Sequence, residues 1–441
     1  MKRVLGVIFN RWVLLVVLLA ALALVIWIVG PLVAIGDWRP LASESSRRIA
    51  IGLLCIVAAL RIVWSRWRAR RGNAAVVSQL LQQPSAAAPE GESPDLAAIR
   101  ERFERALLIL QRARFGSGGR LQALMGRLGG RYLYELPWYL IIGAPGVGKT
   151  TALRHSGLKF PLSEEMGDDL IRGVGGTRHC HWWFTDKAVL IDTAGRFTTQ
   201  DSDAGTDRAT WRGFLQMLRR SRPRQPINGV LVTVSVSDLL TRNATERARY
   251  GAAVRARVQE LHKDLGIQFP IYLLVTKADL LAGFMDYFAK LDKDQRATPW
   301  GFTFKRDKDA PLADFASEFE ALEQRLVDGL IDRLQAEGDP ARRARIYGFP
   351  AQFAGLRPVL HEFAESVFAP SPFEANPQLR GVYFISGTQE GTPIDRVLGA
   401  VARGYRLERM VLAPNEASGR SYFLNRLLND VVFCEAGLAG T

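Results

Sequence analysis

The sequence is poor in the residues that build disulfide frameworks and soft-metal sites. Its 441 residues include three cysteines and five histidines, and the cysteines stand far apart, at Cys55, Cys180 and Cys434. Scattered cysteines, one of them inside an apolar run, argue against a disulfide framework. Residues 179–181 read His-Cys-His, but no further Cys or His stands nearby to complete a metal site. We therefore expect this segment, which continues into residues 182–184, to be a strand at a sheet edge.

An excess of basic charge is also missing from most of the chain. The formal net charge of +14 comes mainly from residues 1–72, which carry 11 Lys and Arg against 2 Asp and Glu. No basic stripe interleaved with aromatic residues occurs in the remainder, so the composition argues against nucleic-acid binding. The sequence also lacks a Ser/His/Asp arrangement and the paired carboxylates of glycosidases.

Two long apolar runs are present near the N-terminus. Residues 12–36 contain no charge and are long enough to cross a bilayer as a helix, and residues 49–64 form a second run broken only by Arg61. A signal peptide has a shorter apolar part and is not followed by a second span. Basic residues flank the outer ends of both runs, so the positive-inside rule places both ends in the cytoplasm. We expect a transmembrane hairpin over residues 1–72, followed by a cytosolic soluble domain.

A phosphate-binding loop follows a strand predicted over residues 138–142. Its pattern is G-x-x-x-x-G-K-T, between that strand and a helix-forming run, which is the context the motif needs. Backbone N–H groups of such a loop surround nucleotide phosphates, while the lysine reaches the β- and γ-phosphates and the threonine binds Mg²⁺. A chance glycine-rich turn is the alternative, but all positions of the motif are filled. The predicted nucleotide-binding residues are Gly143, Ala144, Pro145, Gly146, Val147, Gly148, Lys149, Thr150 and Thr151.

Two further motifs fall in the order that a GTPase-type domain requires. A strand over 188–191 ends in Asp192-Thr-Ala-Gly195, where the carboxylate can hold the Mg²⁺ shell and the N–H of Gly195 can sense a γ-phosphate. Between this motif and the loop, the glycine-rich segment 173–177 ends in a threonine that can cap the metal ion. The predicted Mg²⁺ ligands are Thr150, Thr177 and Asp192.

Recognition of the base is predicted at the ends of two later strands. Residues 271–275 lead into Thr-Lys-Ala-Asp, whose carboxylate can accept from the two N–H donors on the edge of guanine, while the lysine stem covers the ring. Residues 381–385 lead into Ser-Gly-Thr, which can offer a backbone donor to the base oxygen. The alternative is that the aspartate only caps the next helix. The predicted base-site residues are Thr276, Lys277, Asp279, Ser386, Gly387 and Thr388.

Two positions depart from the usual GTPase pattern. Arg196 stands where many GTPases carry the glutamine that orients the attacking water, so Arg196 and Gln200 are the only catalytic candidates. Thr276 replaces the more usual asparagine of the base motif. GTP is the expected nucleotide and ATP the alternative, and the residues leave open whether the nucleotide is hydrolysed.

The rest of the chain divides by composition and helical spacing. Residues 73–95 are rich in Ala, Gln, Pro and Ser, as linkers are, and apolar residues then repeat at helical spacing from Leu96 to Leu110. An apolar stripe predicts a further helix over 312–334, and a last helix is expected over 394–412. The sequence thus predicts an α/β fold, a P-loop GTPase-like mostly parallel sheet flanked by helices. The expected parts are a linker and amphipathic helix over 73–130, the nucleotide domain over 131–412 with a helical insertion near 301–380, and a C-terminal segment over 413–441.

Several runs in and around these motifs carry a family resemblance. They are residues 137–143, 173–177, 182–186, 192–203, 224–229, 275–281 and 387–392. Together they resemble the IcmF/TssM family, inner-membrane components of the bacterial type VI secretion system. The resemblance implies a multi-pass protein of the bacterial inner membrane that helps to build the membrane complex on which the contractile tail docks. A segment like 423–428 continues in family members into a third span and a periplasmic part, so we expect the chain to be part of a longer protein.

The resemblance also implies partners: a DotU-like inner-membrane protein, baseplate subunits and further copies of the chain. Two classes of function follow. In the first, the chain is a scaffold whose nucleotide acts as a conformational switch. In the second, a GTPase cycle drives assembly or protein targeting, as in the signal-recognition-type GTPases, which share Asp-Thr-Ala-Gly-Arg and Thr-Lys-x-Asp. The two apolar runs and the family-specific runs favour the first.

The charge flanks predict a topology that labelling can test. Single cysteines introduced between residues 37 and 46 should react with a membrane-impermeant thiol reagent in intact cells, because the loop is expected outside the cytoplasm. Cysteines introduced after residue 71 should react only after the cells are permeabilised. The reverse pattern would contradict both the topology and a cytosolic nucleotide domain.

Overall fold

The structure, a computed structural model, consists of two compact units that we describe separately. One comprises Met1–Ser78 and Arg127–Gly130, and the other comprises Gln79–Gly126 and Arg131–Thr441. The residues that it describes are 94–115, 134, 136–160, 180–200, 204–305, 311–387 and 421–440, with a few positions between 22 and 61.

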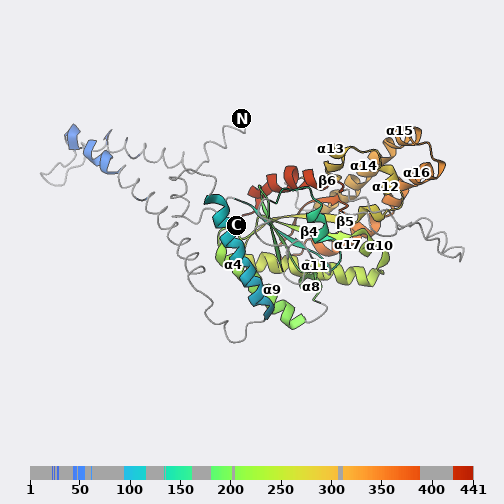
Figure 1. The fold of residues 1–441 in the computed structure, drawn as a ribbon. Helices are drawn as coiled ribbons and strands as arrows, with labels where there is room; N and C mark the ends of the chain where they lie inside the picture. Colours follow the sequence, from blue (N-terminus) through green and yellow to red (C-terminus); the bar gives the residue numbers. More distant parts are fainter. Residues whose placement is uncertain are drawn as a thin grey trace. The chain divides into compact units, whose positions relative to one another are not determined.

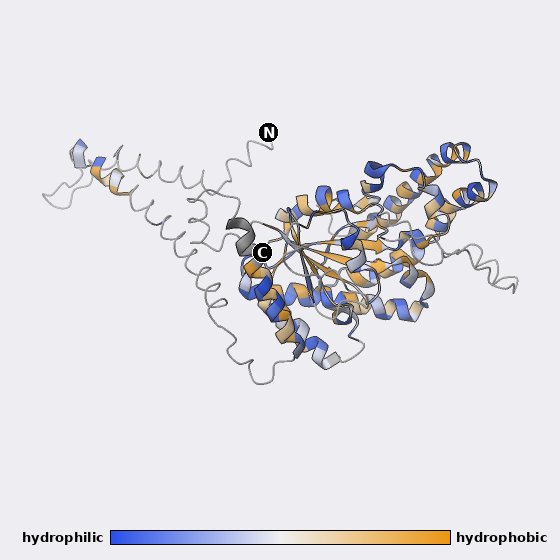
Figure 2. Cartoon of the chain, viewed as in Figure 1, coloured by the Kyte–Doolittle hydropathy of each residue, from blue (hydrophilic) through white to orange (hydrophobic). Residues whose placement is uncertain are grey.

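The described positions of the first unit are short helical pieces that mix polar and apolar residues (Figure 2). Leu24, Ile28 and Ile49 are 61%, 62% and 66% exposed. Among the described residues, no helix combines the length and the apolar character that crossing a bilayer requires. The predicted spans over 12–36 and 49–64 lie largely outside the described residues, so the hairpin stays a prediction.

The second unit is built on a seven-stranded sheet with the spatial order β2-β3-β1-β4-β5-β7-β6. The five central strands are parallel, and the edge strands β2 and β6 pair antiparallel with β3 and β7. The predicted mostly parallel sheet and the predicted edge strand after Cys180 are confirmed. Continuous apolar sequences form the central strands because helices bury both of their faces. The strands are β1 Trp138–Ile142, β2 His181–Phe184, β3 Val189–Asp192, β4 Gly229–Ser235, β5 Pro270–Thr276, β6 Gly301–Thr303 and β7 Gln378–Phe384.

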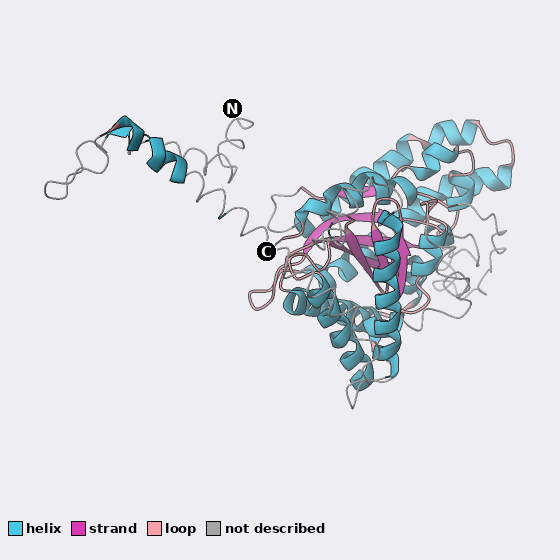
Figure 3. Cartoon of the chain, turned by 60° about the vertical axis from the view of Figure 1, so that its left-hand side comes forward, coloured by secondary structure: helices cyan, strands magenta, loops and turns pink. Residues whose placement is uncertain are grey.

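Helices flank the sheet on both sides (Figure 3). The helix α11 (Ala244–Leu265) has sequence signals at both ends: Asn243 and Glu246 form a capping box, and Gly266 ends the helix with a φ of 67°. The shorter helices around the sheet and its loops are α7 Lys149–Arg154, α8 Gly195–Thr199, α9 Ala204–Ser221, α10 Val236–Thr241, η3 Ala278–Leu280, α12 Phe284–Tyr287 and α13 Lys293–Ala297.

The predicted insertion near 301–380 begins with a strand, β6, and continues as helices. The predicted helical pattern over 312–334 is found, and it is divided at Gly329 into two helices. Its apolar stripe is nevertheless buried from Phe315 to Leu326. The helices α14, α15 and α16 lie together at one end of the unit (Figure 1), and the predicted helix over 394–412 lies outside the described residues. The helices here are η4 Pro311–Asp314, α14 Phe315–Asp328, α15 Leu330–Gln335, α16 Pro340–Ala354 and α17 Arg357–Phe368.

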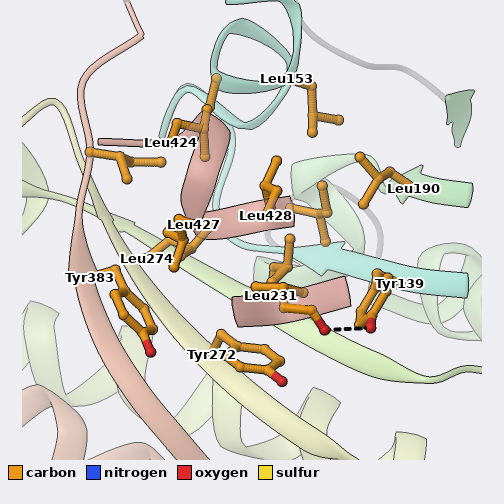
Figure 4. Packing of buried hydrophobic residues seen from close by; sticks show 14 of the residues in the cluster. Tyr139, Leu153, Leu190, Leu231, Tyr272, Leu274, Tyr383, Leu424, Leu427 and Leu428 are labelled. Atoms are coloured by element: carbon orange, nitrogen blue, oxygen red, sulfur yellow. Dashed lines mark hydrogen bonds between the residues drawn. The ribbon is translucent and has the colours of Figure 1, made fainter. Parts of the chain in front are cut away.

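The described C-terminal residues complete the core on one face of the sheet. Leu424, Leu427 and Leu428 pack in one apolar cluster with side chains of β1, β4, β5 and β7 (Figure 4). The Tyr139 hydroxyl also donates to the carbonyl oxygen of Val432 at 2.6 Å. The sequence did not indicate this packing. The segment consists mainly of a π-helix, η5 Leu427–Val432, and a 3-10 helix, η6 Phe433–Leu438.

The helix α4 (Pro94–Phe115) belongs to the second unit, and the helical spacing in the sequence predicted it. Ile99, Phe103 and Leu107 are at most 2% exposed, and the ring of Phe103 lies 5.1 Å from that of Trp182. Each of these three side chains contributes about 1.5–3 kcal/mol by burial, so the body of α4 is firmly attached.

Adjacent leucines of α4 provide a matched test of that attachment. Leu107 is 1% exposed and Leu108 is 39% exposed. We expect Leu107→Ala to lower the free energy of unfolding by about 2–5 kcal/mol, because it leaves a cavity, and Leu108→Ala to lower it by less than about 1 kcal/mol. Denaturant unfolding of the two variants measures both effects, and equal effects would show that α4 is not packed on the domain.

Candidate functional site

The glycine-rich loop connects the end of β1 to the start of α7. Gly146 and Gly148 have φ angles of 76° and 90°, in the left-handed region that L-residues with side chains rarely adopt. A Cβ on Gly143 would lie 2.2 Å from the hydroxyl oxygen of Thr233 in β4, so there is no room for a side chain. Glycine is therefore required at Gly146 and Gly148 by the backbone conformation and at Gly143 by the lack of space for a side chain.

The Lys149 side chain folds back along this loop. It is 6% exposed, and Nζ donates to the carbonyl oxygens of Gly143 and Ala144 at 2.8 and 2.9 Å. Burial lowers the pKa of the ammonium group to about 8, and the charge of Asp192 opposes this shift. A desolvated cation of this kind gains strongly from an adjacent anion.

The two described candidates for a metal site are in direct contact. The Thr150 hydroxyl donates to Oδ2 of Asp192, which is fully buried at the end of β3. A hydroxyl and a carboxylate are the hard oxygen donors that Mg²⁺ prefers, so these residues fit the predicted ion. Thr177, the third predicted ligand, lies outside the described residues.

Gly195 lies directly against the phosphate loop. A Cβ on Gly195 would lie 2.3 Å from the backbone nitrogen of Pro145 and 2.5 Å from its Cα. From the same helix α8, the Thr198 hydroxyl accepts a hydrogen bond from the N–H of Gly143 at 3.1 Å. The loop and the start of α8 are therefore in tight contact at two points, and a displacement of one is transmitted to the other.

Tyr250 of α11 contacts the loop through its hydroxyl, a role that the sequence did not indicate. Its hydroxyl accepts from the N–H of Ala144 and donates to the carbonyl oxygen of Thr233, both at 3.1 Å. Burial raises the pKa of this phenol, so it stays protonated and keeps both roles. The residue lies in the middle of a helix far along the chain, where an apolar pattern predicts only packing.

The base motif is tied to the same loop. The Thr276 hydroxyl donates to the carbonyl oxygen of Val147 at 2.5 Å, so the threonine provides a polar tether in place of the usual asparagine. Lys277 has a φ of 56°, and its Cε would lie 3.9 Å from a Cβ on Gly148. The lysine stem therefore runs alongside the loop.

Asp279 is 1% exposed, and its Oδ1 accepts from the Ser386 hydroxyl at 2.7 Å. Burial raises the pKa of this carboxyl to about 6, while the Ser386 hydrogen bond and the charge of Lys277 oppose the shift. A backbone N–H also stabilises its charged form. The two oxygens of an ionised carboxylate are acceptors of the kind that the N–H donors on the edge of a base require.

Ser386 and Gly387, which follow β7, lie next to Asp279 and α7. A Cβ on Gly387 would lie 3.2 Å from Cα of Ala152 in α7. The backbone of Ser386 exchanges two hydrogen bonds with Tyr422, at 2.8 and 3.3 Å, which the sequence did not indicate. Thr388 lies outside the described residues.

The two catalytic candidates are held by other groups. The guanidinium of Arg196 lies 2.9 Å from Asp95 and 3.4 Å from Asp207. Gln200 ends α8 with a φ of 54°, and its N–H donates to the carbonyl oxygen of Arg196. These positions give neither residue a contact with the phosphate loop among the interactions described.

The structure thus brings most of the predicted residues to one edge of the sheet. Backbone N–H groups and a buried ammonium suit a polyphosphate, and a buried carboxylate suits a donor-bearing base. Within the described parts of the chain, no group of three or more His, Cys, Asp or Glu could hold a metal ion. The described residues that meet here are Gly143–Thr150, Asp192, Gly195, Thr276, Lys277, Asp279, Ser386 and Gly387.

Comparison with known proteins agrees with the resemblance found in the sequence. Residues 204–441 match the model of the IcmF-related N-terminal domain. The type VI secretion system component TssM1 of Pseudomonas aeruginosa is 53% identical to the chain over 359 residues, which make up 80% of this chain and 32% of that protein. The chain therefore spans about a third of the length of that relative. Because the domain match covers more than half of the chain, the protein belongs to the IcmF-related family.

Proposed function

We propose that the chain is the nucleotide-binding switch of an inner-membrane scaffold in a type VI secretion complex. The convergence of four sequence-distant segments around Lys149 and Asp279 is the observation that carries the nucleotide part. The 53% sequence identity to TssM1, a protein named as a component of the type VI secretion system, supports the assignment to a type VI secretion complex. The order β2-β3-β1-β4-β5-β7-β6, with antiparallel strands only at the two edges, supports the GTPase-like form of the P-loop fold.

Each part of the site has a role toward a nucleoside triphosphate. Lys149 leaves the loop carbonyls and neutralises the β- and γ-phosphates, and the N–H groups of Gly146–Thr150 bind their oxygens. Thr150 and Asp192 would hold Mg²⁺, which neutralises phosphate charge when bound. Gly195, the first residue of α8, donates its N–H to the γ-phosphate. Its close contact with Pro145 couples the position of α8 to that of the loop.

Guanine is the base that the site favours. The Asp279 carboxylate can accept both N–H donors on the edge of guanine, and the Ser386 hydroxyl fixes its orientation. Adenine has no such pair of donors, so it would leave the buried carboxylate unmatched. ATP therefore remains the second choice.

Binding without efficient turnover is the mode that the contacts support. Arg196 occupies the position of the water-orienting glutamine, and its guanidinium pairs with Asp95 and Asp207. A partner subunit would have to supply the missing group for a hydrolysis cycle, which is the alternative function. In the secretion complex, the expected contacts are the inner membrane, a DotU-like partner, baseplate subunits and other copies of the chain.

Removal of the Lys149 charge tests the nucleotide site. Lys149→Ala should weaken binding of GTP with Mg²⁺ at least about tenfold, or about 1.4 kcal/mol, because the phosphates lose their buried cation. Lys187→Ala, which removes an exposed lysine from the β2–β3 turn, is the matched control and should bind as the wild type does. Equilibrium titration of the detergent-solubilised chain measures all three, and equal affinities for Lys149→Ala and the wild type would refute the phosphate site.

Replacement of Asp279 tests the base assignment. Asp279→Asn should weaken GTP binding by several kcal/mol and improve binding of xanthosine triphosphate, because the amide donates to the oxo group that replaces the amine of guanine. Competition among GTP, ATP and xanthosine triphosphate gives the ranking. If Asp279 has only a local structural role in the turn of η3, the ranking will not change.

Asp279→Asn is also the control for a predicted pH dependence of GTP affinity. The Asp279 pKa is raised to about 6, so the carboxyl takes up a proton as the pH falls through 6 and loses the ability to accept both donors. GTP affinity of the wild type should therefore fall between pH 7 and pH 5. The weak affinity of Asp279→Asn should stay flat over that range, and a parallel fall would assign the pH effect to another group.

A further inference from the structure

One guanidinium links three helices beside the candidate site. Arg196 of α8 lies 2.9 Å (Nη2–Oδ2) from Asp95 in the first turn of α4 and 3.4 Å (Nη1–Oδ1) from Asp207 in the first turn of α9. The side chains of Arg196 and Asp95 are 29% and 30% exposed, and that of Asp207 is 2% exposed. Asp207 is therefore the buried, fixed acceptor, and Asp95 is the acceptor that water can replace.

Arg196 also follows directly after the glycine that lies against the phosphate loop. Because a Cβ on Gly195 would lie only 2.3–2.5 Å from Pro145, Gly195 cannot move without the loop. A γ-phosphate bound at the Gly195 N–H would act one residue away from Arg196. Its negative charge would also compete with the two carboxylates for the guanidinium.

The helix α4 has two attachments of unequal strength. Ile99, Phe103 and Leu107 are buried and hold the body of the helix. In the first turn, Asp95 pairs with Arg196, and Leu96 packs against α9, since its Cδ2 would lie 2.5 Å from a Cβ on Gly213. Because apolar burial in the body outweighs one half-exposed ion pair, a change at Arg196 would loosen the first turn and leave the rest of the helix in place.

We propose that the Asp95–Arg196 ion pair reports the nucleotide state to the first turn of α4. This rests on the proposed function, since it requires nucleotide at the loop. A bound triphosphate weakens the pair and loosens the first turn, whereas a diphosphate leaves the pair intact. In the sequence, the residues that precede α4 lead back to the apolar runs.

The test uses the full chain in detergent, with two variants of α4. Asp95→Asn removes the carboxylate that faces Arg196. Glu101→Gln is the matched control, because Glu101 makes an exposed pair with Arg105 on the same helix, with side chains 70% and 56% exposed. Hydrogen exchange of amides 95–99 and 103–107 is measured with GDP and with a non-hydrolysable GTP analogue, each with Mg²⁺.

In the wild type, amides 95–99 should exchange at least about fivefold faster with the triphosphate analogue than with GDP, while amides 103–107 should not change. Asp95→Asn should exchange fast in both states. Because coupling between sites is reciprocal, Asp95→Asn should also raise the ratio of triphosphate to diphosphate affinity about fivefold. Glu101→Gln should behave as the wild type does in both measurements.

A purely structural role for Asp95 in the first turn would accelerate exchange in both states and leave the affinity ratio unchanged, which would overturn the proposal. Equal or slower exchange with the triphosphate in the wild type would overturn it too. If the wild type binds nucleotide but α4 does not respond, only this inference fails. If the wild type binds neither nucleotide, the proposed function fails and the inference fails with it.

Discussion

The parallel pairing of β1 with β3 and β4 is the constraint on which the candidate site depends. Parallel strands end at one edge of a sheet, so the residues after β1, β3, β5 and β7 meet although they are far apart in the sequence. The register opposes Ile141 to Asp192 and Ser235 to Thr276. A slip of one residue would turn every side chain of a strand to its other face and separate Thr150 from Asp192.

Local chemistry explains which parts of the site the sequence could predict. The glycines of the loop, Lys149, Asp192 and Asp279 each stand at a strand end in a motif of a few residues, so their positions follow from residue type and order. Tyr250 and the contact of Ser386 with Tyr422 could not be predicted in this way. Each depends on two segments that only the tertiary fold brings together, and the residue types involved are also common in ordinary cores. The break at Gly329 was missed because the apolar spacing continues across it.

The two departures from the usual motif have different physical consequences. Thr276 keeps a polar tether on the phosphate loop with a shorter side chain, so the exchange preserves the link between base motif and loop. Arg196 introduces a cation where a neutral amide is usual, and the fold supplies two carboxylates for it. One departure therefore conserves a contact within the site, whereas the other creates a contact that leads out of it.

Two segments outside the nucleotide motifs contact the site, and the strengths of these contacts differ. The C-terminal segment meets Ser386 through Tyr422, and its leucines are buried in the core of the sheet, each contributing about 1.5–3 kcal/mol. The first turn of α4 meets Arg196 through a half-exposed ion pair, which contributes about 0–1 kcal/mol. An energy of a few kcal/mol is enough to break the second contact but not to remove the buried leucines from the core. The C-terminal segment is therefore part of the buried core beneath Ser386, and the first turn of α4 is the more weakly attached of the two segments.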